Sequence, residues 1–374
     1  MATERAEGLR GIVINDSKLS LVDGDAGRLI YRGYPIEELA GNVSFEESAY
    51  LLWHGYLPTP VELKDLKASF RLTRPLEEPM KRIMRTLPKG AQPMSLLRTA
   101  VSAAGLLDQK SDRANENVTH EACERMTAKV SSIIAAQWRL RLDEEIVDPH
   151  ATLDHAANFL FMLRGEEPSD LEAEVFDTCL VLHLDHGYNA STFTALITAS
   201  SLSDIYSAVA SALGTLRGRL HGGANTAVME MLQEIERPEK AAAYVKDMLD
   251  KKLKVMGFGH PVYKVIDPRA NILKVLGHRL AEESGRTRWM EMCEVIEKVM
   301  MDEKGIPCNV DFYSAPVYHM LGIHMQLFTP IFALSRVVGY TAHILEQYAN
   351  NKIIRPRCNY VGDVDRSFVP IDER

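Results

Sequence analysis

Residues 257–263 read Gly-Phe-Gly-His-Pro-Val-Tyr, and Asp267-Pro-Arg269 follows four residues later. Gly257 and Gly259 just before His260 favour a tight turn, and the next residue, Pro261, disfavours helical geometry at the histidine. An aspartate followed by proline is typical of a helix start. A cation in the first turn opposes the helix macrodipole, so we expect Arg269 to bind an anion. The stretch therefore predicts a turn that presents a histidine, although a loop histidine beside a helix cap would look the same.

Around this turn, helical signals dominate the chain. Capping boxes begin at Ser44, Thr59 and Ser169, each with glutamate three residues later. The helix after Ser169 is expected to end at Gly187, with His186 on its buried face. Apolar spacing predicts further helices at 94–107, 127–142, 203–217, 224–235, 238–252, 268–282, 287–302 and 329–350.

The exception to this helical pattern is the N-terminal segment 11–34. Apolar residues alternate there from Ile12 and Ile14 to Tyr31, around a turn composition at Asp23–Gly27. Residues after Pro356 lack periodicity and are expected to lie extended over a surface. The predicted fold class is all-α with a small N-terminal β-hairpin.

Composition restricts the class of protein. The 374 residues are 46% hydrophobic and 25% charged, which is typical of a soluble globular protein with more than one domain. The net charge of -8 disfavours nucleic acid and anionic membranes as partners. Five scattered cysteines without CxxC spacing favour reduced thiols, and no apolar run is long enough for a signal peptide or membrane span. We therefore expect a cytoplasmic location.

Four stretches combine reactive side chains with glycine, proline or aromatic residues: 184–192, 220–225, 257–263 and 309–314. Each is weak evidence alone, because His221 could simply cap a helix and His186 could be a core histidine. Asp311 is more informative. Its apolar neighbours Val310 and Phe312 make burial of a carboxylate unfavourable unless it has a partner or a chemical role.

Taken together, these stretches resemble the citrate synthase family, which includes the 2-methylcitrate synthases. The matching segments are VDGDAGRLIYRGYPIEELA at 22–40, LHGGAN at 220–225, MGFGHPVYK at 256–264, DPRA at 267–270, NVDFYS at 309–314, LFTPIFALSR at 327–336 and IIRPR at 353–357. They are collinear over nearly the whole chain. The resemblance implies a two-domain helical fold: a large, dimer-forming domain of residues 1–221 and 317–374, and a small domain of residues 222–316 that closes over the active-site cleft.

The resemblance also implies a reaction. The methyl carbon of an acyl-CoA, most simply acetyl-CoA, condenses with the ketone of oxaloacetate, and hydrolysis of the thioester gives citrate and coenzyme A. Asp311 matches the base that removes the carbon-bound proton. His221 matches the donor to the thioester oxygen, and His260 the donor to the ketone oxygen. Coenzyme A enters as a co-substrate, with no permanent cofactor and no metal.

Other matching residues have binding roles in the family. Arg269, Arg336, Arg355 and His186 match the groups that bind the two carboxylates of oxaloacetate. The residue matching Arg355 reaches the neighbouring subunit's site, which implies an obligate homodimer. The coenzyme A segment is matched by Lys254, Val255, Met256, Gly257 and Phe258. Many bacterial relatives have arginine where this chain has Pro261 and proline where it has Arg219, so coenzyme affinity stays open.

Three alternatives remain at this point. A metal-dependent hydrolase could use His183, Asp185 and His186, because residues three apart share a helix face, but it lacks a third ligand motif and leaves the arginines unexplained. A non-catalytic helical assembly protein would not need the reactive residues that are present. A 2-methylcitrate synthase would use propionyl-CoA, and one methylene changes discrimination by only about 1–3 kcal/mol. No sequence feature decides between the two acyl groups.

Overall fold

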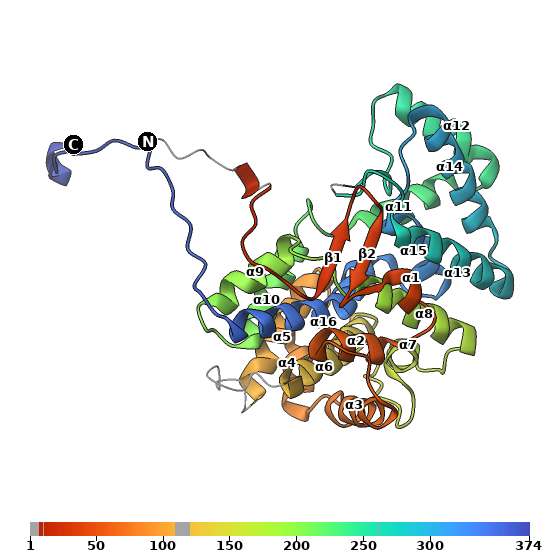
Figure 1. Cartoon of the computed structure of the whole chain (residues 1–374), viewed down its shortest axis with the longest axis horizontal. Coiled ribbons are helices and arrows are strands. Elements are labelled where there is room, and N and C mark those ends of the chain that lie inside the picture. The colour runs from red at the N-terminus through yellow and green to blue at the C-terminus, as the bar shows by residue number, and fades with distance from the viewer. Residues whose placement is uncertain (1–6, 10, 109–119, 261) are drawn as a thin grey trace.

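The computed structural model describes residues 7–9, 11–108, 120–260 and 262–374, and in these residues helices form most of the molecule (Figure 1). The helices are α1 Ile36–Leu39, α2 Phe45–His54, α3 Pro60–Thr73, α4 Glu78–Thr86, α5 Pro93–Leu107, α6 His120–Arg141, α7 His155–Arg164, α8 Asp170–His183, α9 Ala190–Ser200, α10 Ile205–Leu216, α11 Ala224–Ile235, α12 Pro238–Asp250, α13 Pro268–Ser284, α14 Arg288–Lys304, α15 Val310–Met320 and α16 Phe328–Ala349. Short 3-10 turns lie at Glu7–Leu9, Met325–Leu327 and Ile371–Glu373. The predicted all-α class is confirmed.

The β structure of the described residues is one small antiparallel sheet in the order β1-β2-β3. Its strands are β1 Ser20–Asp23, β2 Arg28–Tyr31 and β3 Tyr34–Pro35. The predicted hairpin turn is confirmed, because Asp23 pairs with Arg28 across it. The predicted extension of β structure to Ile12 and Ile14 is wrong. No strand pairs with this segment, and Val13 at its centre is 84% exposed.

Local capping signals predicted helix starts well. Ser44, Thr59 and Ser169 each accept a hydrogen bond from the backbone N–H three residues later, and the glutamate there bonds back to the cap backbone. These boxes satisfy N–H groups that a helix start otherwise leaves unpaired. The predicted helices correspond to α5, α6, α10–α14 and α16, whereas α4, α7, α9 and α15 were not predicted.

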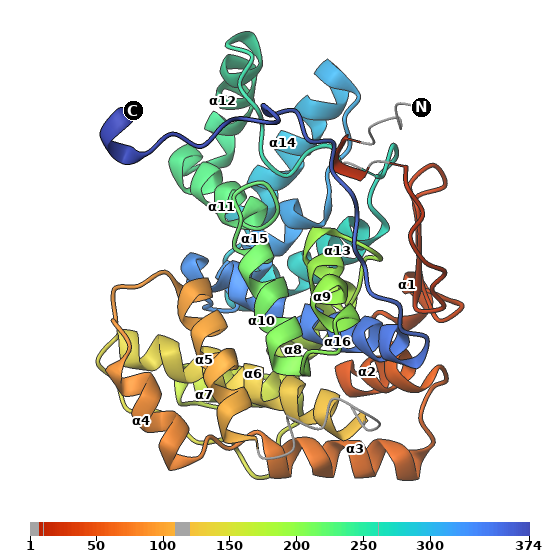
Figure 2. The same cartoon turned by 90° about the vertical axis from the view of Figure 1, so that its left-hand side faces the viewer.

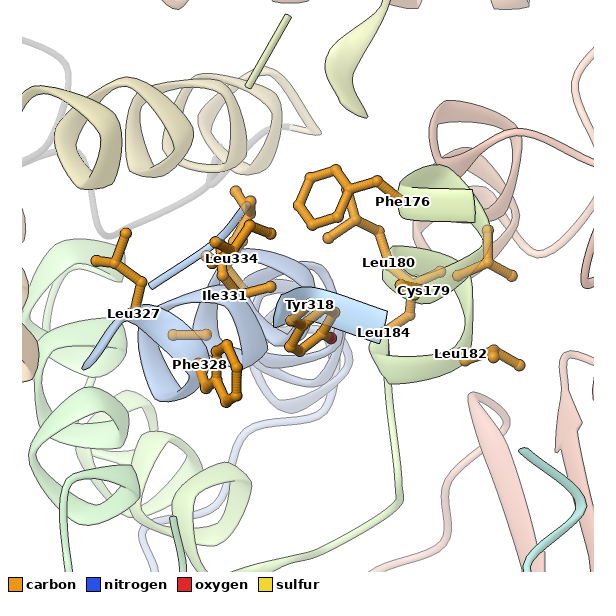
Figure 3. Close-up of a cluster of buried hydrophobic side chains, with 14 of the residues drawn as sticks. Phe176, Cys179, Leu180, Leu182, Leu184, Tyr318, Leu327, Phe328, Ile331 and Leu334 are labelled. Carbon is orange, nitrogen blue, oxygen red and sulfur yellow. The ribbon is translucent and has the colours of Figure 1, made fainter. Parts of the chain in front are cut away.

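Helix α16 forms the centre of the larger part of the molecule. It is buried on most of its faces and packs against α2, α5, α6, α8, α9 and α10. Figure 3 shows one apolar cluster in which Phe176 and Leu180 of α8 lie near Tyr318 of α15 and Phe328 of α16. Burial of each such large apolar side chain stabilises the fold by about 1.5–3 kcal/mol. This packing holds the C-terminal end of α8 beside α16, where the candidate site lies.

Helix α8 ends at His183, four residues before the predicted end at Gly187. The prediction that His186 lies on this helix is therefore wrong. The reason is tertiary. Arg336 Nε donates to the His183 carbonyl at 2.7 Å, which takes an acceptor from the last turn. The Tyr31 hydroxyl accepts from the Asp185 N–H and also bonds the Asp185 carbonyl. The backbone therefore leaves the helix and places His186 in an irregular segment between a bend at Leu184 and one at Gly187.

Helices α11, α12, α13 and α14 gather at one end of the molecule, with α15 packed against α11 and α13 (Figure 1). Residues 351–354 are still joined to the body by hydrogen bonds to Ser200. The residues after Pro356 are extended, as predicted, but they project away from the body of their own chain and are almost fully exposed (Figures 1 and 2). The expected surface contact is thus absent within the described chain. No described helix is long and apolar enough to cross a membrane.

Candidate active site

A cavity of about 430 Å³ lies where the end of α8, the starts of α11, α13 and α15, and one face of α16 meet. Ten sequence-predicted residues line it: Lys254, Met256, Gly257, Phe258, His186, His221, His260, Arg269, Asp311 and Arg336. Val255 does not line it and is buried beneath the surface. Arg355 does not line it either, and lies in the exposed C-terminal segment. The cavity thus combines one carboxylate, three imidazoles and two guanidinium groups.

Asp311 is in the first turn of α15. The Asn309 side chain accepts the Asp311 N–H at 3.0 Å and donates to the Gly259 carbonyl at 2.8 Å, which joins this helix start to the His260 turn. No described residue donates a hydrogen bond to the Asp311 carboxylate itself. Burial raises the pKa of Asp311 to about 6. Asp311 is therefore a carboxylate poised to accept a proton near neutral pH.

His260 is held by its own turn. Its Nδ1 accepts from the backbone N–H groups of Val262 and Tyr263 at 3.0 and 3.1 Å. Burial, and then the charge of Arg269, lowers the pKa of His260 to about 4. In the neutral ring the proton must then be on Nε2, which is free to donate to a ligand. Gly257 is required here, because its φ is 84° and a Cβ would lie 2.8 Å from Phe312.

His221 is held from the large helical body. Its Nε2 lies 2.7 Å from Ser191 Oγ, and the Tyr340 hydroxyl donates to that same oxygen at 2.7 Å. Burial, and then the charge of Arg336, lowers the pKa of His221 to about 4. Ser191 Oγ also lies 2.7 Å from Asn189 Oδ1, and its one proton can go to Asn189 or to His221 Nε2. In the arrangement in which Ser191 donates to Nε2, the neutral ring carries its proton on Nδ1, and His221 is a second neutral donor. Ser191 lies in the 184–192 stretch but was not predicted as a functional residue.

The two arginines of the cavity differ in their partners. Arg269 is fully buried, and its Nε and Nη2 donate to both oxygens of Asp267 at 2.9 and 2.8 Å. Burial alone would raise the pKa of Asp267, but the attraction of Arg269 outweighs it and holds that pKa below its usual range. Arg336 instead lies over the Phe332 ring, donates to a backbone carbonyl, and has a buried Nη2 without a partner among the described residues. Arg336 thus keeps an unused donor for an anion.

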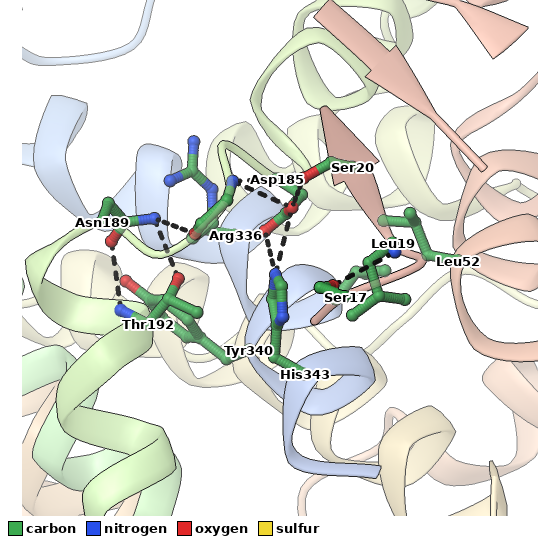
Figure 4. A network of polar contacts seen from close by, with 12 residues as sticks. Ser17, Leu19, Ser20, Leu52, Asp185, Asn189, Thr192, Arg336, Tyr340 and His343 are labelled. Atoms are coloured by element: carbon green, nitrogen blue, oxygen red, sulfur yellow. Dashed lines mark hydrogen bonds and ion pairs between the residues drawn. The ribbon is translucent and has the colours of Figure 1, made fainter. Parts of the chain in front are cut away.

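A polar network fixes the segment before His186 (Figure 4). The Asp185 carboxylate accepts from Ser20, from the Gly187 N–H at 3.1 Å and lies 3.2 Å from His343 Nε2. His186 Nε2 lies 3.2 Å from the Tyr263 hydroxyl, and burial holds the pKa of His186 well below its usual range. His186 is therefore neutral and faces the His260 turn.

These contacts also bear on the metal-dependent hydrolase alternative. His183 Nδ1 lies 2.7 Å from its own helix carbonyl of Cys179, while Asp185 and His186 have the separate partners described above. Across the described ranges no group of three or more histidine, cysteine or acidic side chains is arranged to hold a metal ion. His183, Asp185 and His186 therefore do not form a metal-binding group.

The predicted coenzyme A segment forms one edge of the cavity. The Gly257 carbonyl accepts from Asn309 N at 2.9 Å and Gly259 N donates to the Pro307 carbonyl at 3.0 Å, so the segment is joined by backbone bonds to the start of α15. Pro261 lies outside the described residues. Arg219 is exposed and does not line the cavity, so its effect on coenzyme affinity stays a prediction.

Comparison with known proteins gives a consistent result. The family profile described as "Citrate synthase, C-terminal domain" matches residues 8–357. A citrate synthase of Haloferax volcanii is 49% identical over the whole of both chains, and citrate synthase 2 of Bacillus subtilis is 48% identical over 98% of each. A 2-methylcitrate synthase of Shewanella oneidensis is 40% identical over 98% of this chain and 97% of its own.

Solved structures of citrate synthases have the same fold as this chain. A crystal structure of citrate synthase from Pyrobaculum aerophilum superposes with a TM-score of 0.93 at 38% identity, covering 98% of this chain and 95% of that one. A citrate synthase from Thermoplasma acidophilum, solved as a ternary complex with carboxymethyl coenzyme A and oxaloacetate, gives a TM-score of 0.91 at 32% identity, covering 99% of this chain and 100% of that one.

Proposed function

This chain belongs to the citrate synthase family, and we propose that it condenses acetyl-CoA with oxaloacetate to give citrate and coenzyme A. The observation that carries the proposal is the meeting, in one cavity, of an unpartnered Asp311 carboxylate with the neutral imidazoles of His221 and His260. A base and two hydrogen-bond donors are what a carbon–carbon condensation through an enolate requires.

In the proposed reaction, Asp311 takes a proton from the acetyl methyl group while His221 donates a hydrogen bond to the thioester oxygen. The resulting enol or enolate carbon attacks the ketone carbon of oxaloacetate, and the ketone oxygen takes the Nε2 proton of His260. Solvent returns a proton to His260, and Asp311 releases to solvent the proton that it removed, so the step balances. Water then cleaves the thioester, which releases citrate and coenzyme A. Neutral imidazoles suit these steps, because each has one N–H that can donate a hydrogen bond to an oxygen on which negative charge develops.

Oxaloacetate brings two carboxylates, and the proposed ligands for them are Arg269, Arg336 and His186 together with Arg355 of a second subunit. The unused Nη2 of Arg336 supports its role, since a buried guanidinium donor without a partner favours an anion. Lys254, Val255, Met256, Gly257 and Phe258 are the proposed coenzyme A segment, through their backbone and the cavity edge that four of them form.

The test of the activity is a thiol-release assay with oxaloacetate and either acetyl-CoA or propionyl-CoA. We expect kcat/KM to be larger for acetyl-CoA, which would separate citrate synthase activity from 2-methylcitrate synthase activity. A matched control omits oxaloacetate and measures thioester hydrolysis alone. Thiol release that does not depend on oxaloacetate would reject condensation and leave a thioesterase.

We further propose a homodimer in which Arg355 completes the partner's cavity. Arg355 is exposed and directly follows Ile354, whose N–H donates to Ser200 Oγ, and it does not line its own cavity. Arg355→Ala and Asp311→Asn homodimers should each be nearly inactive. When the two are unfolded and refolded together in equal amounts, half of the dimers should be hybrids with one intact site, so about a quarter of wild-type activity should return. Hybrids confirmed by native mass spectrometry without recovered activity would contradict the shared site.

Residues 222–316 are proposed to form a small domain that closes over bound oxaloacetate and excludes water. The packing of α11–α15 among themselves supports this division. Small-angle X-ray scattering with and without oxaloacetate should show a decrease in the radius of gyration, and an unchanged value would contradict closure. A cytoplasmic location stays a prediction.

A further inference from the structure

The β1–β2 hairpin touches both segments that carry the proposed oxaloacetate histidines. At its base, Ser20 and Tyr31 bond to Asp185, the residue before His186. At its tip, the Gly24 carbonyl accepts from the Lys264 N–H at 2.9 Å, four residues after His260. Figure 1 shows the hairpin rising from the helical body, with this loop at its tip.

The contact at the tip is unusually close. A Cβ built on Gly24 would lie 2.1 Å from the Val262 carbonyl oxygen and 2.6 Å from its carbon. The φ of Gly24 is not in the left-handed region, so glycine is needed here for close approach and not for backbone conformation. At the other end of the turn, a Cβ on Gly27 would lie 2.6 Å from a methyl carbon of Val265. At Gly24 backbone packs on backbone, so a change of rotamer could not relieve a clash there, whereas the Val265 side chain at Gly27 could move.

This contact leads directly to the His260 ring. The residue whose carbonyl rests on Gly24 also donates its N–H to His260 Nδ1, at 3.0 Å. Tyr263 donates to the same nitrogen at 3.1 Å. A displacement of Val262 therefore moves the two bonds that hold the imidazole and that leave Nε2 as the donor.

The base of the hairpin acts on His186 in a similar way. Tyr31 OH bonds the Asp185 carbonyl at 3.0 Å and accepts from the Asp185 N–H at 3.2 Å, while Ser20 Oγ accepts from Gly187 N at 3.2 Å. The rings of His186 and His260 have centroids only 5.3 Å apart. The same hairpin thus contacts the backbone segment that carries His186 and the one that carries His260.

The hairpin has the rigidity that such a role needs. Asp23 Oδ1 accepts from the N–H groups of Asp25 and Ala26 at 3.1 and 3.0 Å, which fixes the turn from within. An ion pair of Lys264 with Asp25 is exposed on both sides and contributes little. Packing and backbone bonds, and not charge, join the tip to the loop.

We infer that the hairpin Ser20–Tyr31 is a positioning element that sets the placement of His260 relative to His186, and so aligns the ketone of oxaloacetate with its donor. The inference rests on the proposed function. None of the hairpin residues lines the cavity, so they act through the two histidine segments and not on substrate.

The test compares Gly24→Ala with Gly90→Ala. Gly90 has no heavy atom within 4 Å of a built Cβ and no left-handed φ, so it controls for the general effect of adding a methyl group. Moving Val262 by about 1 Å should lower kcat for thiol release by roughly 10–100-fold. The ¹³C resonance of the ketone carbon of bound oxaloacetate should shift towards its position in free oxaloacetate, because the bond from His260 weakens. Gly90→Ala should change neither.

A second variant, Asp23→Ala, loosens the turn without adding a clash and should lower kcat by a factor of about 3–10, with a smaller shift of the same resonance. It carries the test if Gly24→Ala does not fold. If Gly24→Ala folds, a wild-type kcat and an unshifted resonance in this variant would overturn the inference. If only Asp23→Ala folds, the same two results in that variant would overturn it. Lost activity with an unshifted resonance would also overturn it. Wild-type protein without oxaloacetate-dependent thiol release would instead reject the proposed function.

Discussion

The two walls of the cavity are built differently. On the α16 wall, Arg336 is fixed by a backbone carbonyl and an aromatic ring and keeps an unused donor. On the α13–α15 wall, Arg269 is already paired with Asp267, while Asp311 has no partner for its carboxylate. The first wall offers a free cation and the second a free base. The unused cationic donor and the unpartnered base thus come from different walls, although Arg269 of the second wall is also a proposed carboxylate ligand.

The largest expected effect is on the free base. Asp311→Asn should lower kcat by at least about 10²–10⁴-fold, because general-base catalysis contributes that much. Oxaloacetate affinity should be retained, since the α16 wall is unchanged. Exchange of the acetyl-CoA methyl protons with deuterated water, followed by NMR, should fall in parallel. Exchange at the wild-type rate in the variant would place the base elsewhere.

Replacing Arg269 should mainly lower the stability of the fold, whereas replacing Arg336 should mainly weaken oxaloacetate binding. Arg269→Ala leaves Asp267 buried without its partner and should lower the free energy of unfolding by about 3–5 kcal/mol. Arg336→Ala leaves no such lone charge, so it should weaken oxaloacetate binding more than it affects the fold. Urea unfolding and calorimetric titration of both variants measure this contrast.

The control for this pair is the double variant Arg269→Ala with Asp267→Asn, which removes the lone carboxylate and should recover part of the lost stability. Equal losses of stability in Arg269→Ala and Arg336→Ala would contradict the difference between the two walls.

The unpartnered carboxylate should also leave a pH signature in stability. Burial raises the pKa of Asp311 from 3.8 to about 6. Ionisation therefore destabilises the folded state increasingly as pH rises from about 4 to 6, and by a constant amount above. Asp311→Asn should thus be more stable than wild type by about 3 kcal/mol at pH 7.5, and the difference should vanish near pH 4. Urea unfolding at the two pH values checks this, and a pH-independent difference would contradict it.

The smallest expected effect concerns the support of His221. Ser191→Ala removes the hydroxyl that selects the tautomer of His221, so kcat should fall by a factor of about 10, with KM for oxaloacetate nearly unchanged. Ser201→Ala is the matched control, because its exposed hydroxyl bonds only the Thr198 carbonyl. A wild-type kcat in Ser191→Ala would show that Tyr340 and Ser191 do not act through His221.

Much of the fold could be read from local patterns. The three capping boxes and most helix boundaries were predicted because each depends on side chains within about four residues of one another. Helices α9 and α15 were not predicted, although the side chains of Asn189 and Asn309 cap them by accepting from backbone N–H groups two or three residues later. Asn189 and Asn309 are the signals that could have located both helices.

The sequence by itself determined the helical class, the hairpin turn and, through collinear motifs, membership of the citrate synthase family with its reaction. Only the tertiary structure decided that α8 ends before His186, that Ser191 and Tyr340 support His221, and that Arg269 is paired while Arg336 is not. The physical reason is the range of the interactions. A cap joins neighbours in the sequence, whereas Arg336 reaches the His183 carbonyl across 153 residues and Tyr31 reaches Asp185 across 154, and such contacts exist only once the helices have packed.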